Sequence, residues 1–197
     1  MPGRAGASWP VDGQRVTARL ELKPIARADT HHLRQLHRDP GIARWYAGAW
    51  SMGQAAEFAA AMEQAWQADG VGKWLAYRRE DGALIGRGGC SFATVEGRRQ
   101  VEIGWAIREA YWGHGYATEI GRAGLAFAFE MLHVDRVIAF TEVHNLRSRA
   151  VMQRLGMTNA HEFHSPGLMP GSEDIHDDAL FALYETTRGY AGDRRPN

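Results

Sequence analysis

A nine-residue segment with two glycines, YWGHGYATE, lies between an apolar strand pattern and an apolar helix pattern. On its N-terminal side, residues 101–107 alternate β-branched or aromatic residues with others, which is typical of a half-buried strand. On its C-terminal side, apolar and small residues recur at helical spacing from Ala117 to Met131. The chain is therefore expected to contain a strand, a tight glycine turn and a helix in direct succession.

This turn has the features of a phosphate-binding loop. Gly113 and Gly115 lack the Cβ atoms that would keep a ligand away from the backbone. The helix that follows offers unpaired N–H groups at its first turn, where a pyrophosphate can bind. A tight turn without any ligand is the alternative that the glycine pair alone leaves open.

Two better-known glycine loops do not fit the segment. A dinucleotide-binding fingerprint needs a third glycine where this chain has Thr118, and no acidic residue follows at the required spacing. A P-loop needs Gly-Lys-Ser or Gly-Lys-Thr, and neither tripeptide occurs in the chain. A phosphate site here must therefore belong to another class of glycine loop.

Several motifs together resemble the GNAT acetyltransferases, over about residues 19–187. The segment from Glu102 to Met157 resembles the family core, and more narrowly the branch that contains the ribosomal-protein N-terminal acetyltransferases. That branch follows a tryptophan-glycine loop with Asn-x-x-Ser and a helix end of the Leu-Gly-Met type, seen here as Asn145, Ser148 and LGM at 155–157. Trp112 stands where the wider superfamily often has Gln or Arg, which is usual within this branch.

The resemblance implies an acetyl-CoA-dependent N-acetyltransferase that moves an acetyl group to a primary amine by direct attack. It implies that Glu102 is the general base and that Ser148 gives a proton to the departing thiolate. A base is useful because an α-amine with a pKa near 8 is only about a tenth neutral at pH 7. For Glu102 the alternative is a solvent-facing strand residue.

The cofactor contacts that the resemblance implies are mainly backbone contacts. They fall at the end of the strand 101–107, around the glycine turn and at Asn145. Asn145 would form a hydrogen bond with the pantetheine amide. Asn is also among the best helix N-caps, so a purely capping role for Asn145 stays open. The predicted cofactor-binding residues are Ala106, Ile107, Trp112, Gly113, His114, Gly115, Tyr116, Ala117, Thr118 and Asn145.

The order of strand and helix patterns predicts one domain of the α+β class. We expect a GNAT-like mixed, mostly antiparallel sheet of six to seven strands, splayed in the middle and flanked by about four helices. The predicted boundaries are a flexible leader at 1–16, a single acetyltransferase domain at 17–188 and a polar tail at 189–197. A chain of 197 residues can bury a core of this size.

Composition excludes several classes of partner. Lys plus Arg and Asp plus Glu each number 23, so no net charge favours nucleic acid or an anionic membrane. The N-terminus has no apolar signal region and no stretch has the length of a membrane span, which predicts a cytoplasmic protein. The nine histidines lack metal-ligand spacing, so no metal is expected, and Cys90 fits core packing.

The amine acceptor is the least constrained part of the prediction. The resemblance places its pocket between Trp45, Tyr46 and Trp50 on one side and residues 162–178 on the other. The acidic residues of segment 162–178 would attract the ammonium group of the acceptor, or else they are only solvated surface residues. They are Glu173, Asp174, Asp177 and Asp178. The acceptor is expected to be a small molecule or a protein N-terminus, with the enzyme a monomer or homodimer. The alternative is a catalytically silent acyl-CoA-binding sensor or interaction domain.

Overall fold

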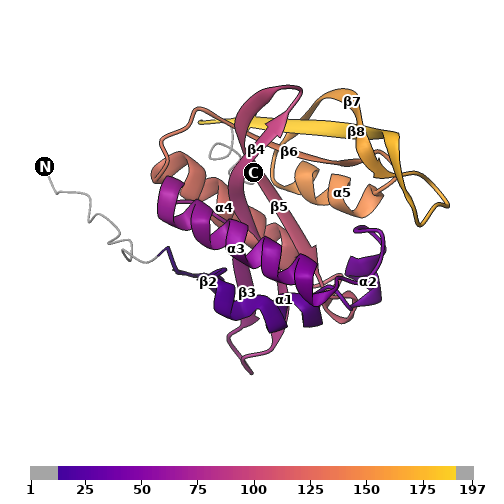
Figure 1. Cartoon of the computed structure of the whole chain (residues 1–197). Helices are drawn as coiled ribbons and strands as arrows, with labels where there is room; N and C mark the ends of the chain where they lie inside the picture. Colours follow the sequence, from indigo (N-terminus) through magenta and orange to yellow (C-terminus); the bar gives the residue numbers. More distant parts are fainter. Residues whose placement is uncertain (1–12, 190–197) are drawn as a thin grey trace, which may run out of the picture.

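The structure, a computed structural model, describes residues 13–189. Eight strands form one sheet (Figure 1). They are β1 (Arg15–Val16), β2 (Leu20–Pro24), β3 (Trp74–Arg78), β4 (Leu84–Val95), β5 (Arg98–Ile107), β6 (Arg136–Glu142), β7 (Thr158–Leu168) and β8 (Ile175–Thr187). The order across the sheet is β1-β2-β3-β4-β5-β6-β8-β7. The chain therefore builds the sheet in sequence order, except that the last hairpin enters with β8 inside and β7 at the edge.

The helices begin and end where the sequence chemistry requires. Ser51 caps the longest helix in a reciprocal box with Gln54, and Gly70 ends it in the left-handed conformation. Asn145 Oδ1 accepts from the N–H of Ser148 at the start of the last helix. The helices are α1 (Thr30–Leu36), α2 (Pro40–Ala43), α3 (Met52–Asp69), α4 (Tyr116–Glu130) and α5 (Leu146–Arg154), with 3-10 turns η1 (Arg27–Asp29) and η2 (Glu109–Tyr111).

Helices cover both faces of the sheet. In β3, Trp74 and Ala76 pack in the cluster that includes α4, whereas Leu75 between them packs with Leu33 of α1 and residues of α3. This alternation is the two-residue period of a strand buried on both sides. The centre of the sheet is thus fixed between two helical layers.

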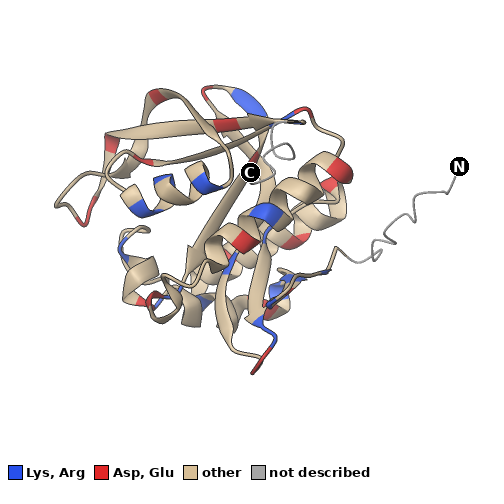
Figure 2. Cartoon of the chain, turned by 180° about the vertical axis from the view of Figure 1, so that it is seen from behind, with Lys and Arg blue, Asp and Glu red and all other residues tan. Residues whose placement is uncertain are grey.

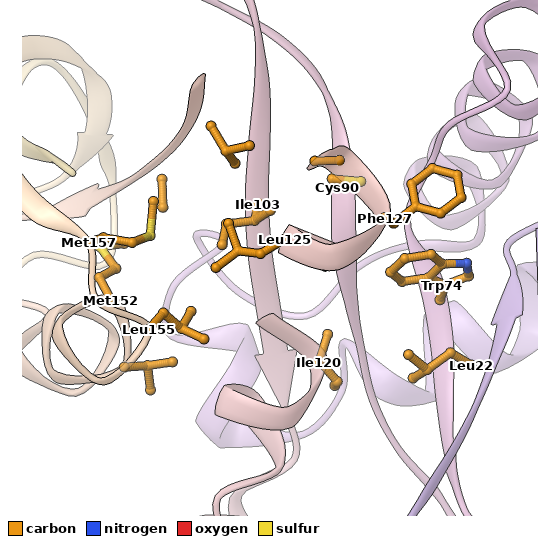
Figure 3. Packing of buried hydrophobic residues seen from close by; sticks show 14 of the residues in the cluster. Leu22, Trp74, Cys90, Ile103, Ile120, Leu125, Phe127, Met152, Leu155 and Met157 are labelled. Atoms are coloured by element: carbon orange, nitrogen blue, oxygen red, sulfur yellow. The ribbon is translucent and has the colours of Figure 1, made fainter. Parts of the chain in front are cut away.

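The main core lies between the sheet and α4 (Figure 3). The rings of Trp74 and Phe127 meet edge to face with centroids 5.6 Å apart. Cys90 lies beside them and is fully buried, and burial raises the pKa of its thiol to about 12. A thiol held neutral in this way packs as a small apolar side chain, as the sequence predicted.

The sheet is splayed in its middle. β5 and β6 run parallel and share a single paired position, Glu102 opposite Ile138, while all other neighbouring strands are antiparallel. β4 and β5 pair over ten positions by contrast. The predicted fold class and the predicted splay are confirmed.

The strand count differs from the expected six to seven. Residues 15 and 16, expected in the leader, pair with β2 as the short strand β1. Residues 158–168, which overlap the predicted acceptor segment 162–178 and were not expected to form a strand, form β7. β7 was not recognised in the sequence because most of its residues are polar and exposed at the sheet edge. The other parts of the predicted leader and tail, 1–12 and 190–197, lie outside the described residues, and the domain boundaries stay predictions.

Basic and acidic residues are interspersed along much of the chain (Figure 2). One exception is α5, which carries Arg147, Arg149 and Arg154 and no acidic residue. None of the helices in the described part of the chain is both long and apolar enough to span a bilayer.

Candidate active site

A cavity of about 1150 Å³ lies where β5 and β6 separate. Its walls come from α2, β5, the glycine turn, the end of β6 and the first turns of α5. The two predicted catalytic residues, Glu102 and Ser148, both line it. Of the ten predicted cofactor-binding residues, all except His114 line it as well. Predicted residues from three separate stretches of sequence are thus brought to one cavity.

The glycine turn adopts the conformation that its residues permit. Gly113 and Gly115 have φ values of 81° and 79°, in the left-handed region where glycine has no steric penalty. A Cβ placed on Gly113 would meet no atom within 4 Å, so the space above it is open. No backbone carbonyl of the described residues accepts a hydrogen bond from the N–H groups of residues 113–118. These amides are available to an anion at the start of α4.

The Trp112 side chain supports the turn from inside. Its Nε1 donates to the carbonyl of Ile107 at 2.8 Å, and its ring packs so closely on Gly41 that a Cβ there would overlap it. The guanidinium of Arg147 lies over the same ring, 4.2 Å from the centroid. Local sequence does not predict this structural role, because two of the three partners, Gly41 and Arg147, lie far away in the chain.

His114 does not line the cavity, and it contributes to the turn's own hydrogen bonding. Its Nδ1 lies 2.8 Å from the carbonyl oxygen of Trp112. Its own carbonyl accepts from Arg19 at 2.8 Å. Its role in cofactor binding stays a prediction. Like those of its neighbours in the turn, its backbone N–H donates to no backbone carbonyl of the described residues.

Glu119 ties the turn to the β1–β2 connection. Its carboxylate accepts from the Thr17 hydroxyl at 2.6 Å and from the Arg19 backbone N–H at 2.9 Å, and it pairs with the Arg19 guanidinium. Burial acts to raise the pKa of Glu119, but these hydrogen bonds and the Arg19 charge lower it on balance. The ionised carboxylate therefore holds the first turn of α4 against the edge of the sheet.

Glu102 is paired with a lysine. Lys73 Nζ lies 2.5 Å from Glu102 Oε2 and also donates to the carbonyl of Gly89 at 2.9 Å. The side chains of Glu102 and Lys73 are only 14% and 9% exposed, and both residues line the cavity. Glu102 thus faces the cavity, not bulk solvent, with one carboxylate oxygen held by the ammonium group.

Asn145 and Ser148 share the first turn of α5. The Asn145 amide oxygen accepts from the Ser148 N–H at 3.2 Å, so the capping role is real. Both residues also line the cavity, which leaves the Asn145 amide nitrogen and the Ser148 hydroxyl as groups that can face a ligand. Capping and ligand contact are compatible because they use different atoms of the same residues.

Aromatic residues line the part of the cavity assigned to the acceptor. Trp45, Tyr46 and Phe58 are in its wall, and the Trp50 ring stacks on His37 with centroids 3.3 Å apart. The four acidic residues of the predicted acceptor loop, Glu173, Asp174, Asp177 and Asp178, do not line it. All four are exposed, in or near the β7–β8 turn.

Three buried charged residues of the cavity were missed from the sequence. They are Lys73, Arg87 and Glu142, and all three are buried. Lys73 is one of only two lysines in the chain, but nothing local connects it with a carboxylate 29 residues later. Within residues 13–189, no group of three or more His, Cys, Asp or Glu side chains is arranged to hold a metal ion.

Comparison with protein families gives one match that covers most of the chain. The model of the acetyltransferase (GNAT) domain matches residues 19–158. This range runs from the beginning of the β2 region to the start of β7 and includes the whole glycine turn.

Individual proteins and solved structures are also similar to the chain. The chain is 28% identical over 143 residues to YkkB of Bacillus subtilis, covering 72% of this chain and 83% of that protein. It is 30% identical over 156 residues to FsC-acetyl coenzyme A-N(2)-transacetylase of Aspergillus fumigatus, covering 75% and 66%. Among solved structures, ribosomal-protein-S5-alanine acetyltransferase of Vibrio fischeri superposes with a TM-score of 0.69 at 12% identity, covering 93% and 99%.

Proposed function

Because the chain belongs to the GNAT acetyltransferase family, we propose that it moves the acetyl group of acetyl-CoA to a primary amine by direct attack, with Glu102 as general base. Acetyl-CoA-dependent N-acetyl transfer is the activity of the family. The base, the acid and the kind of acceptor are the parts proposed for this chain. The observation that carries the proposal is that Glu102, Ser148 and the glycine turn line one cavity.

The glycine turn fits the diphosphate of the co-substrate. Its free amides and the open space above Gly113 suit an oxyanion that approaches the backbone closely. The extended backbone of Ala106 and Ile107, at the end of β5, suits hydrogen bonding to the pantetheine arm. Asn145, whose oxygen already caps α5, has its amide nitrogen left for the same arm.

Glu102 acts as the base in this proposal. A carboxylate on the cavity wall can accept the proton of the attacking amine directly or through one water. The ion pair with Lys73 holds the carboxylate in place, which keeps the accepting oxygen at a fixed position relative to the amine. Ser148 lies in the first turn of the helix that begins at the cavity and donates its hydroxyl proton to the departing thiolate. The proton that Glu102 takes from the amine returns to Ser148 through solvent, so that one proton passes overall from nitrogen to sulfur.

The acceptor is either a small-molecule amine or a protein N-terminus. One structurally similar enzyme is named for an alanine of ribosomal protein S5, and this supports a protein N-terminus as one of the two candidate acceptors. The aromatic wall of Trp45, Tyr46 and Phe58 suits either class, because it offers apolar contact around a polar centre. We propose that the reaction takes place in the cytoplasm.

The test is thiol release from acetyl-CoA in the presence of a panel of amines, combined with thermal unfolding. Acetyl-CoA at about 100 times its dissociation constant should add about 2.7 kcal/mol to the free energy of unfolding. At least one amine should stimulate thiol release above the rate of hydrolysis. Binding of acetyl-CoA without release for any amine would favour the silent sensor, and absence of binding would refute the proposal.

A further inference from the structure

Arg87 is a buried cation in the wall of the cavity. It lies on β4, opposite Ala106 of β5, and the residue is only 5% exposed. Its side chain leaves the sheet on the face opposite α4, because the Cβ positions of its neighbours Gly86 and Gly88 face Ile107 and Ile120. In the described part of the chain, no carboxylate lies within ion-pair distance of it.

Neutral groups hold the Arg87 guanidinium in position. Its Nε donates to His37 Nε2 at 2.9 Å, and its carbon lies over the rings of Tyr46, Trp50 and Phe58 at 5.2, 5.5 and 4.6 Å from their centroids. Burial, followed by the nearby Arg87 charge, lowers the pKa of His37 to about 2, so its ring is neutral. The aromatic faces orient the cation, but none of these partners carries a negative charge.

The other charges of the cavity do not neutralise Arg87. Glu102 is already paired with Lys73 at 2.5 Å. Glu142 lies on β6, across the gap in the sheet, and its near contacts are the Thr141 hydroxyl and the Leu168 N–H at 3.4 and 3.5 Å. The outer nitrogens of Arg87 make no hydrogen bond to the described residues and are not among the buried atoms left without a partner, so they reach open space.

A buried guanidinium without a counter-ion is unfavourable unless a ligand supplies the missing charge. We propose that Arg87 binds an anionic group, a carboxylate or a phosphate, that the acceptor carries in addition to its amine. This inference rests on the proposed function, since it assigns Arg87 to the acceptor of that reaction. A planar guanidinium with free outer nitrogens can bond such a group through two oxygens at once.

The spacing suits one small acceptor, or the first residues of a peptide. Arg87 pairs with Ala106 and Glu102 pairs with Ser91, so the two side chains begin four residues apart along the strands. That separation is about 13 Å between Cα atoms. Both side chains line the same cavity, so the anion would bind at one end of the acceptor while the amine faces Glu102.

The first experiment uses the wild-type enzyme with matched pairs of acceptors. Free amino acids are compared with their carboxamides, and phosphoethanolamine with ethanolamine, by thiol release from acetyl-CoA. The anionic member should have the higher kcat/KM by about 10-fold or more, the usual range for a hydrogen-bonded charge pair. The carboxylate and phosphate pairs distinguish the two sources of the anion. Equal rates within every pair would overturn the proposal.

The second experiment replaces Arg87 by Met, which keeps the length of the side chain and removes its charge. Arg87→Met should lose the preference within the matched pairs while retaining acetyl-CoA binding, measured as a thermal shift. Arg27→Met is the matched control, because Arg27 forms a surface ion pair with Glu63 and does not line the cavity. A preference that survives Arg87→Met, or lost acetyl-CoA binding in a folded variant, contradicts the assignment.

A third measurement does not depend on turnover. With CoA present to occupy the glycine turn, calorimetric titration compares N-acetylglycine with N-acetylglycinamide, and inorganic phosphate is titrated separately under the same condition. The wild type should bind N-acetylglycine or phosphate. Its affinity for N-acetylglycinamide should be lower by about 10-fold or more. If no amine is acetylated, the proposed function fails. These titrations still test whether Arg87 binds an anion, because they do not depend on turnover. Absence of binding by N-acetylglycine and by phosphate would refute it, even if Arg87→Met does not fold.

Discussion

Lys73 and Glu102 form an ion pair of 2.5 Å between residues 29 positions apart. Lys73 immediately precedes β3 and Glu102 lies in β5, with β4 between the two strands. The Lys73 ammonium also holds the carbonyl of Gly89, which belongs to that intervening strand. One side chain thus connects three strands at the base of the cavity and fixes the carboxylate that faces it.

The proposed base predicts a defined kinetic defect. Glu102→Gln keeps the size of the side chain but cannot accept a proton. Its kcat should fall by about 100-fold or more, while its affinity for acetyl-CoA is retained. Steady-state thiol release and a thermal shift with acetyl-CoA measure the two quantities. Unchanged turnover would remove Glu102 from the mechanism.

Lys73→Met should destabilise the fold, because it leaves the Glu102 carboxylate without its partner in a mostly buried place. We expect a loss of about 2 to 4 kcal/mol in the free energy of unfolding. Glu102→Gln added to Lys73→Met should recover part of that loss, since the uncompensated charge is then removed. Denaturant unfolding of the two single variants and the double variant measures this coupling. Simple additivity would show that the pair contributes nothing.

Replacing Gly104 tests the position of the Glu102 carboxylate with little effect on the stability of the fold. A Cβ on Gly104 would come within 2.7 Å of Glu102 Oε1, the movable end of a side chain. Gly104→Ala should therefore displace the carboxylate at little cost to stability. We expect kcat to fall by about 10-fold or more through misplacement of the base, with less than about 1 kcal/mol lost in unfolding. Normal kcat would mean that the orientation of Glu102 does not matter.

The glycine turn can be tested with a pair of matched alanine variants. Gly113 and Gly97 have φ values of 81° and 74°, and a Cβ on either would meet no atom within 4 Å. Each replacement by Ala should cost about 1 to 2 kcal/mol of stability through backbone strain alone. Only Gly113→Ala should also weaken acetyl-CoA binding, because Gly97 lies in the β4–β5 turn and does not line the cavity. Equal affinities, measured by calorimetry, would argue against the turn as the diphosphate site.

Glu119 predicts how stability depends on pH. Its pKa is lower in the folded state than in the unfolded chain, so its contribution is present above the unfolded value of about 4.3 and disappears as pH falls through the folded value. Glu119→Gln should cost about 1 to 3 kcal/mol at neutral pH. The difference from the wild type should shrink as pH is lowered below about 4. Denaturant unfolding at several pH values checks this, and a difference that does not change with pH would contradict it.

Much of the fold could be predicted from local patterns. The alternation of residues 101–107, the capping box of Ser51 and Gln54, and the glycines at 70 and 156 determine strands and helix ends through short-range chemistry. The edge strand β7 escaped prediction because its exposed residues show no period of two in apolar character. Helix ends and buried strands thus carry a readable signal, whereas an exposed edge strand does not.

The glycine turn and the motif around Asn145 could be read from the sequence because the groups that each needs are close together in the chain. The partners of the charged side chains could not, since Lys73 with Glu102 and Arg87 with His37 meet only when distant strands and helices pack. An isolated Lys or Arg looks the same in sequence whether it is solvated or buried. Tertiary packing decided which carboxylate is held in place and which cation is left without a counter-ion, because burial and ion pairing are properties of neighbours in space.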